Sequence, residues 1–139
     1  TANTLQLATL SGLMRLIDSD VIIWNWRSQE AAASLLAAEP FAISAMTYME
    51  LVQGMRNARE LKKLQADLAL WQVTILPIST AISERASRLV EEHFLTHHLQ
   101  LADALIAATA IEHKLAIVTS NTKHFQAVKT LKIEAFKPR

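Results

Sequence analysis

The chain has no cysteine, only two glycines and only three prolines in 139 residues, and each scarcity excludes a class of protein. Without cysteine there is no disulfide framework and no thiolate zinc site. All-β folds need many tight turns, which are made with glycine and proline, so this composition favours long helices joined by few tight loops. No stretch approaches 18 uncharged apolar residues, and we therefore expect no membrane-spanning helix.

An excess of one charge is also missing. Fourteen lysines and arginines stand against 13 aspartates and glutamates, which gives a formal net charge of +1 and not the strongly basic balance of many nucleic-acid-binding domains. The hydrophobic share of 51% and charged share of 19% exclude a disordered tail. A chain of this length buries roughly two thirds of its unfolded surface, which is enough for one domain with one core.

The first thirteen residues differ from the rest of the chain. Residues 1–13 carry no charge, and Met14 then opens the apolar stretch MRLIDSDVII. A secretory signal would begin with basic residues, which this segment lacks. We predict that residues 1–13 are vector-derived or otherwise non-native and that a single domain covers residues 14–139. A genuine N-terminal strand or arm is the alternative.

Strand signals and helix signals alternate along the domain. Short apolar stretches predict strands at residues 15–18, 41–44, 72–78, 116–119 and 131–136. Helical patterns fall at residues 28–39, 45–55, 57–71, 79–98, 101–115 and 121–129, with Ser44, Asn57 and Ser79 or Thr80 as N-caps. This order predicts an α/β fold with a mainly parallel sheet and helices on both faces.

Three acids lie where apolar residues are expected. Asp18, Glu50 and Asp103 each have apolar neighbours in the sequence, although acids are rarely buried unless they are paired. An unpaired buried carboxylate is costly, and several together repel one another. A divalent cation that prefers oxygen ligands, Mg²⁺ or Mn²⁺, removes both costs, and Asn121 can add an amide oxygen. Such a site suits phosphodiester hydrolysis.

Each of these residues also has a purely structural interpretation. Asp103 could be the N-cap of its helix, and Asp18 could be a turn residue at the end of its strand. Glu50 could be a partly solvated helix residue, and Asn121 could cap the helix that follows the fourth strand. The position of Asp18, Asp20, Ser120 and Asn121 just past strands favours a shared site, because ligands bind at the carboxyl ends of parallel strands.

Four stretches carry a resemblance to a known family: MRLIDSDVII, SAMTYMELVQGM, LADALIAATAIEHKLAIVTSNTKHF and LKIEAF. The chain resembles the PIN-domain ribonucleases, and most closely the VapC-type toxins of VapBC toxin–antitoxin pairs. The third stretch is the most specific. The resemblance implies a PIN-like three-layer α/β/α sandwich with a mainly parallel central sheet, in agreement with the order of elements above.

The resemblance also implies an activity and a site. The protein would be a metal-dependent endoribonuclease toxin that hydrolyses RNA of the translation machinery, with Mg²⁺ or Mn²⁺ held by Asp18, Glu50 and Asp103. Asn121 would fill a fourth position that is acidic in many PIN enzymes, and Thr119 and Ser120 would support the site at the strand end. Asp20 stands where the family often has asparagine, and it is either a supporting residue or an added ligand. Whether one or two metals bind stays open.

Partners follow from the same resemblance: RNA, a VapB-like antitoxin, and a second copy in a homodimer, all in the cytoplasm and without a membrane. Positive charge that could follow an RNA backbone lies at Arg56, Arg59, Lys62 and Lys63, with Lys123 near the site; an ordinary solvated helix face is the alternative. His124, beside Asn121, is a candidate for RNA contact or a surface residue.

Two rival functions stay open at this point. Asp18-Ser19-Asp20 after an apolar strand is also the opening motif of haloacid-dehalogenase-like phosphatases, although the late acidic pair of that family is missing. The chain could also be a catalytically weak PIN-fold protein-binding module, because Asn121 replaces an acid.

Overall fold

Five parallel strands form the centre of the molecule, in the order β3-β2-β1-β4-β5. The computed structural model describes residues 14–138, so the prediction about residues 1–13 lies outside the described residues. In chain order the elements are β1 (Arg15–Ile17), α2 (Ser19–Trp26), α3 (Glu30–Ala38), β2 (Ala42–Ser44), α4 (Ala45–Gln53), α5 (Ala58–Leu70), β3 (Thr74–Leu76), α6 (Thr80–His97), α7 (Leu101–Glu112), β4 (Ala116–Thr119), the 3₁₀ helix η1 (Thr122–His124) and β5 (Ile133–Ala135).

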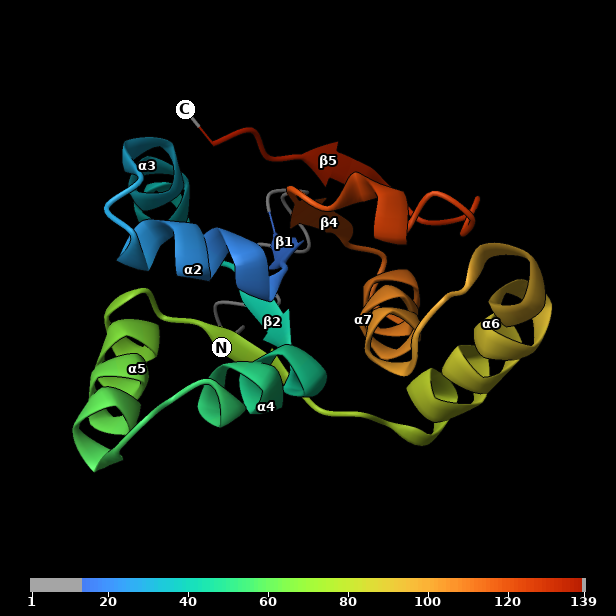
Figure 1. Cartoon of the computed structure of the whole chain (residues 1–139), viewed down its shortest axis with the longest axis horizontal. Coiled ribbons are helices and arrows are strands. Elements are labelled where there is room, and N and C mark those ends of the chain that lie inside the picture. Colours follow the sequence, from blue (N-terminus) through green and yellow to red (C-terminus); the bar gives the residue numbers. More distant parts are fainter. Residues whose placement is uncertain (1–13, 139) are drawn as a thin grey trace, which may run out of the picture.

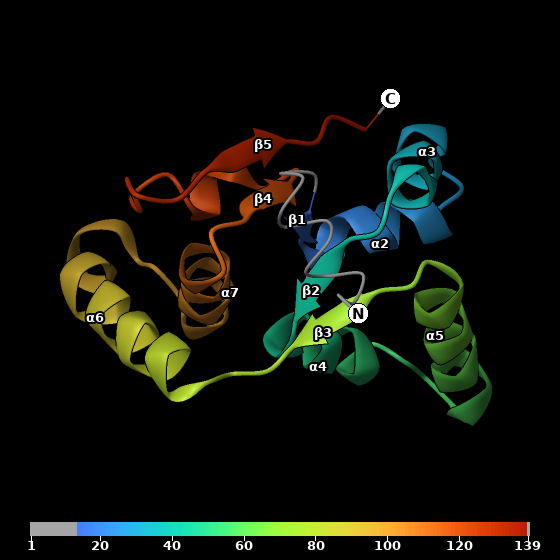
Figure 2. The same ribbon diagram turned by 180° about the vertical axis from the view of Figure 1, so that it is seen from behind.

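Helices cover both faces of this sheet, as Figures 1 and 2 show from opposite sides. Successive strand residues point to opposite faces. Leu16 and Ile117 pack with α6 and α7 in one apolar cluster, whereas Ile17 and Val118 pack with α2, α3 and α5 in a second cluster. The predicted α/β/α sandwich with a parallel sheet is therefore confirmed.

Local sequence signals account for most helix starts. Ser44, Asn57 and Ser79 are the N-caps of α4, α5 and α6, and each side chain accepts a hydrogen bond from a backbone N–H three residues later. Asp103 is not an N-cap, because that position of α7 belongs to Gln100 and Asp103 lies in the first turn. The structural interpretation of Asp103 as a cap is therefore wrong.

Three predicted elements are much shorter than the sequence indicated. The helix expected over residues 121–129 is only the 3₁₀ turn η1, and the strands expected over residues 72–78 and 131–136 each cover three residues. Gly54 is the C-cap of α4, whereas residues other than glycine adopt left-handed backbone angles at or just after the ends of α2, α5, α6 and α7, namely Ser28, Gln72, His98 and Lys114. None of the helices in residues 14–138 has the length and apolar content needed to cross a bilayer.

The strand order creates one favoured place for a site. From β1 the chain turns through α2 and α3 to β2 on one side, whereas it reaches β4, on the other side of β1, only after α6 and α7 on the opposite face. Connections therefore leave β1 and β4 in opposite directions, and in open α/β sheets ligands bind at the carboxyl ends of two such strands. Asp18 follows β1 and Ser120 follows β4 at this place.

Candidate active site

Asp18 is the most buried acid of the site, with 7% of its surface exposed. It is the N-cap of α2, and its Oδ1 accepts the backbone N–H of Ser19 at 2.9 Å. Its Oδ2 accepts the hydroxyl of Thr119 at 2.8 Å, which joins the ends of β1 and β4. Burial, with the neighbouring charge of Asp20 as the next cause, raises the pKa of Asp18 from 3.8 to about 6 despite these two hydrogen bonds.

Asp20, in the first turn of α2, reaches across to the segment that follows β4. Its Oδ2 accepts hydrogen bonds from the backbone N–H of Ser120 at 2.7 Å, from the Ser120 hydroxyl, and from the amide of Asn121 at 3.3 Å. The Thr119 hydroxyl lies 3.4 Å from the same oxygen. The other oxygen, Oδ1, is buried and has no hydrogen-bond partner.

Glu50 and Asp103 complete a group of four acids. Glu50 lies on α4 and Asp103 on α7, and these helices pack against each other. Burial, and then the charge of Asp103, raises the pKa of Glu50, and Asp18 also senses the charge of Glu50. Burial raises the pKa of Asp103, while His124, whose Nδ1 is 3.8 Å from Asp103 Oδ2, lowers it in part. The structure therefore brings the four predicted acids within electrostatic reach of one another.

No lysine or arginine in residues 14–138 forms an ion pair with any of the four acids. Within this described part of the chain, the only basic side chain that pairs with one of them is the exposed His124, which lies against Asp103. Buried acids usually have such partners, and here their absence leaves repulsion and burial to raise the pKa of three of them.

A divalent cation fits this site by its chemistry. Carboxylate oxygens are the ligands that Mg²⁺ and Mn²⁺ prefer, and the buried Oδ1 of Asp20 lacks any donor. Among residues 14–138 no three His, Asp or Glu side chains are already arranged to hold an ion, so binding would require side chains to turn. Glu50 has no hydrogen bond or ion pair in the described part of the chain that would oppose such a turn.

The sequence prediction missed two features of the site. The network around Asp20 joins residues about 100 positions apart, and no local pattern indicates it. The contact between His124 and Asp103 depends on η1 lying against the start of α7, which the predicted longer helix did not describe. Asn121 occupies the N-cap position of η1 but makes no side-chain capping bond, so its capping interpretation is wrong, and its amide is turned to Asp20.

The basic residues suggested for RNA contact have different surroundings. Arg56 pairs with Glu60 at 2.7 Å, and Lys63 pairs with Asp67 at 2.9 Å. No partner is found in residues 14–138 for Arg59, Lys62 or Lys123, which are exposed. A hollow of about 910 Å³ lies between the end of α2 and the start of α5, and its lining includes Ile23, Trp26, Arg27, Met55, Arg56, Arg59 and Lys63 but not Lys62.

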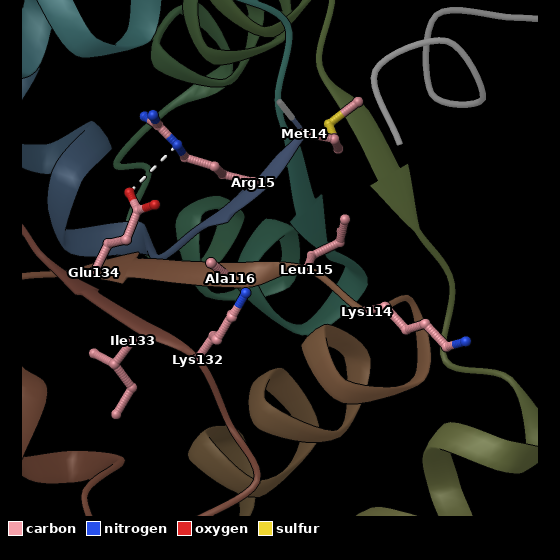
Figure 3. Close-up of a pocket in the computed structure, with 8 residues that line it drawn as sticks. All are labelled: Met14, Arg15, Lys114, Leu115, Ala116, Lys132, Ile133 and Glu134. Carbon is pink, nitrogen blue, oxygen red and sulfur yellow. Dashed lines mark ion pairs between the residues drawn. The ribbon is translucent and has the colours of Figure 1, made fainter. Parts of the chain in front are cut away.

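A second hollow, of about 500 Å³, lies at the opposite end of the strands and is shown in Figure 3. It is lined by the first residues of β1 and β4 together with the start of β5. Arg15 pairs there with Glu134 at 3.3 Å and also with Glu39 at 3.5 Å. Lys114 and Lys132 complete its charged lining.

The fold agrees with a comparison against known proteins. The profile of the PIN-domain family matches residues 15–131, and the chain therefore belongs to this family. Membership excludes the haloacid-dehalogenase-like alternative. Ribonuclease VapC10 of Mycobacterium tuberculosis is 36% identical over 126 residues, which are 86% of this chain and 91% of that protein.

Solved structures give the same result. A chain of a toxin–antitoxin complex from Klebsiella pneumoniae has a TM-score of 0.69 and 33% identity, covering 84% of this chain and 94% of its own. VapBC2 from Rickettsia felis, bound to a DNA fragment from its promoter, has a TM-score of 0.74 at 21% identity, covering 89% and 99%, and so shares the fold.

Proposed function

We propose that this protein is a divalent-metal-dependent endoribonuclease and the toxin of a toxin–antitoxin pair. The observation that carries the proposal is the group of four acids at the carboxyl ends of β1 and β4, which no lysine or arginine of the described chain neutralises. A relative named ribonuclease VapC10 supports the same activity, and the alignment with this chain covers 91% of that relative. A toxin that cleaves RNA of the translation machinery would act in the cytoplasm.

Asp18, Glu50 and Asp103 would hold the metal, which is Mg²⁺ or Mn²⁺ in this proposal. When bound, such an ion acidifies water and stabilises negative charge that develops on the phosphate and on the leaving oxygen. Thr119 and the Ser19 N–H hold the Asp18 carboxylate in one orientation through its two oxygens. Since both oxygens accept hydrogen bonds, the Asp18 carboxylate would be presented to the ion in one orientation. Because the bound ion would acidify the water, no histidine base is needed.

The experiment is incubation of purified protein with RNA in Mg²⁺ or Mn²⁺, followed by sequencing of the new RNA ends. We expect cleavage that stops with EDTA and returns with added metal, and new ends that carry 5′-phosphate and 3′-hydroxyl groups. Mapping RNA ends after expression in a bacterium tests the further proposal that the target belongs to the translation machinery. Cleavage that continues in EDTA contradicts the proposed activity.

The alternative of a catalytically weak binding module makes the opposite prediction. It requires that Mn²⁺ neither raises the melting temperature nor supports RNA cleavage. Asn121 was the reason for this alternative, but three predicted ligands and Asp20 retain their carboxylates.

We propose the hollow between α2 and α5 as the docking place of the antitoxin. Its apolar lining, formed by Ile23, Trp26 and Met55, is edged by cations, and this combination suits a segment that carries apolar and acidic side chains. Asp20 and Trp26 lie on the same helix, roughly 9 Å apart along its axis, so a partner in the hollow comes close to the acids. The Klebsiella relative in its toxin–antitoxin complex supports such a partner.

The affinity of the protein for its VapB-like antitoxin, measured with variants of the hollow, tests this docking place. The change Ile23→Glu puts a charge into the hollow and should weaken binding at least about tenfold. Leu70→Glu is the matched control, because Leu70 is 77% exposed on α5 and does not line the hollow. Equal binding by both variants would place the partner elsewhere.

We also propose that a second copy of the chain covers the turn between α6 and α7. Phe94, Leu95 and Leu101 lie there with 44%, 86% and 71% of their surfaces exposed, which is unusual for side chains of this size. Light scattering should show a dimer for the wild type and for Leu70→Glu, but a monomer for Leu95→Glu. A dimeric Leu95→Glu variant would reject this surface.

A further inference from the structure

Asp20 differs from the other acids of the site because its two oxygens have opposite surroundings. Oδ2 is saturated by donors from Ser120 and Asn121, whereas Oδ1 is buried without any donor. A residue that served only to hold the turn after β4 would gain nothing from a buried oxygen that lacks a partner, because such an oxygen costs free energy. The orphaned oxygen therefore needs a separate explanation.

The position of Asp20 makes its charge part of the acidic site. It lies in the first turn of α2, two residues after Asp18, and both side chains are within reach of the Thr119 hydroxyl. The charge of Asp20 is large enough there to act on Asp18 more strongly than that of Glu50. Any cation held by Asp18 is therefore also attracted by Asp20.

The side-chain amide of Asn121 forms a hydrogen bond with Asp20. Its Nδ2 donates to Asp20 Oδ2 at 3.3 Å, although the two residues are 101 positions apart. The Asn121 amide donates to the same oxygen that accepts from the N–H and the hydroxyl of Ser120, so this atom of residue 20 has to be an acceptor only. A carboxylate at position 20 meets this requirement, whereas a carboxylate at position 121 would bring two acceptors together.

We propose that Asp20, rather than the turn residue Asn121, supplies the fourth negative charge of the metal site. The proposal rests on the proposed metal-dependent function. In it, Oδ2 of Asp20 positions the turn that follows β4, and Oδ1 faces the ion or its hydration shell. Asp20 thus positions the turn and completes the charge of the site with one side chain.

Three variants separate the two roles of Asp20. Asp20→Asn keeps a carbonyl oxygen that can accept from Ser120 and removes only the charge. Asn121→Asp places a second carboxylate against Asp20 and removes the donor between them. The double variant Asp20→Asn with Asn121→Asp restores the total charge of the wild type but moves the carboxylate to the exposed position 121. Glu91→Gln, on the exposed side of α6, is the control for the loss of a charge outside the site.

The affinity for Mn²⁺, measured by calorimetric titration, and the melting temperature in EDTA are the readouts. We expect Asp20→Asn to weaken Mn²⁺ binding by about tenfold or more without lowering the melting temperature in EDTA. Asn121→Asp should lower that melting temperature, because two carboxylates then face each other. The double variant should bind Mn²⁺ no better than Asp20→Asn, because its carboxylate then lies at the exposed position 121 and not at position 20.

Asp103→Asn separates failure of this inference from failure of the proposed function. If Asp103→Asn loses Mn²⁺ binding but Asp20→Asn binds as the wild type does, the role of Asp20 is overturned and the function stands. A double variant that binds Mn²⁺ as tightly as the wild type also overturns the assignment of the charge to position 20. If the wild type itself binds no Mn²⁺, the proposed function fails and the inference fails with it.

Discussion

The two ends of the central sheet carry charge in opposite ways. At the amino ends of the strands, Arg15 forms an ion pair with Glu134, which Figure 3 shows. Arg15 forms a second ion pair with Glu39. At the carboxyl ends, four acids gather with only the exposed His124 as a basic contact within residues 14–138. The same sheet therefore holds compensated charge at one end and uncompensated charge at the other.

This difference shows which end the fold keeps for binding. Compensated, partly exposed ion pairs add little to stability and attract no further ion. Uncompensated buried acids weaken the metal-free protein, and this cost is removed when a cation binds. The contrast between the ends therefore indicates function more directly than the size of either hollow.

The largest expected effect is on RNA cleavage. Asp103→Asn should lower kcat/KM more than about 100-fold, because it removes one of the proposed ligands of the ion. Glu134→Gln, which removes one acid at the amino ends, should leave the rate within about twofold. Initial rates of cleavage of one labelled RNA at saturating Mn²⁺ measure both. Equal rates for the two variants would remove the distinction between the ends.

The next effect is on stability with metal. At pH 7 and about 100 times its dissociation constant, Mn²⁺ should raise the free energy of unfolding by about 2.7 kcal/mol. The gain should remain in Glu134→Gln and disappear in Asp18→Asn. Thermal melts with and without EDTA provide the measurement, and a gain that persists in Asp18→Asn would place the ion elsewhere.

A somewhat smaller effect follows from the pKa of Asp18 in the metal-free protein. The pKa is about 6 in the folded chain and near 3.8 in the unfolded chain, so between these pH values the folded state binds more protons. The free energy of unfolding in EDTA should therefore fall by about 2 kcal/mol as pH rises from about 4 to 7. Urea unfolding at several pH values measures this slope. Asp18→Asn should flatten most of it, and an unchanged slope in that variant would contradict the assignment.

The smallest effect belongs to the amino ends of the strands. Arg15→Met breaks both ion pairs of Arg15, whose partners are partly exposed, and should lower the free energy of unfolding by at most about 1 kcal/mol. The loss should shrink in high salt, and the Mn²⁺ effect should stay as in the wild type. A change in the Mn²⁺ effect would show that the two ends are coupled.

The parts of the fold that could be predicted are those with local signals. Ser44, Asn57 and Ser79 mark helix starts by a bond to a backbone N–H three residues away, and this information lies within one turn. The helix predicted over residues 121–129 was wrong beyond the turn η1, although Phe125 and Val128 have the spacing of residues on one side of a helix. Both are buried against the α6–α7 side of the sheet, and this packing rather than a helix fixes the backbone there.

The site was predictable in its residue types but not in its connections. Asp18, Glu50 and Asp103 stand out in the sequence because their neighbours are apolar, and a parallel sheet gathers strand ends on one side. The bonds of Asp20 to Ser120 and Asn121 depend on β1 and β4 being neighbours, which the order of elements along the chain leaves undetermined. Tertiary topology therefore supplies what local pattern lacks.

The Thr119 hydroxyl has a single hydrogen, and two carboxylates lie within reach of it, that of Asp18 at 2.8 Å and that of Asp20 at 3.4 Å. The same oxygen accepts the backbone N–H of Asn121 at 3.0 Å. Thr119→Val would therefore remove one donor and one acceptor in a single step, while serine would keep the hydroxyl. Because Thr119 is fully buried, residue 119 has to supply this hydroxyl and also fill the space at the end of β4.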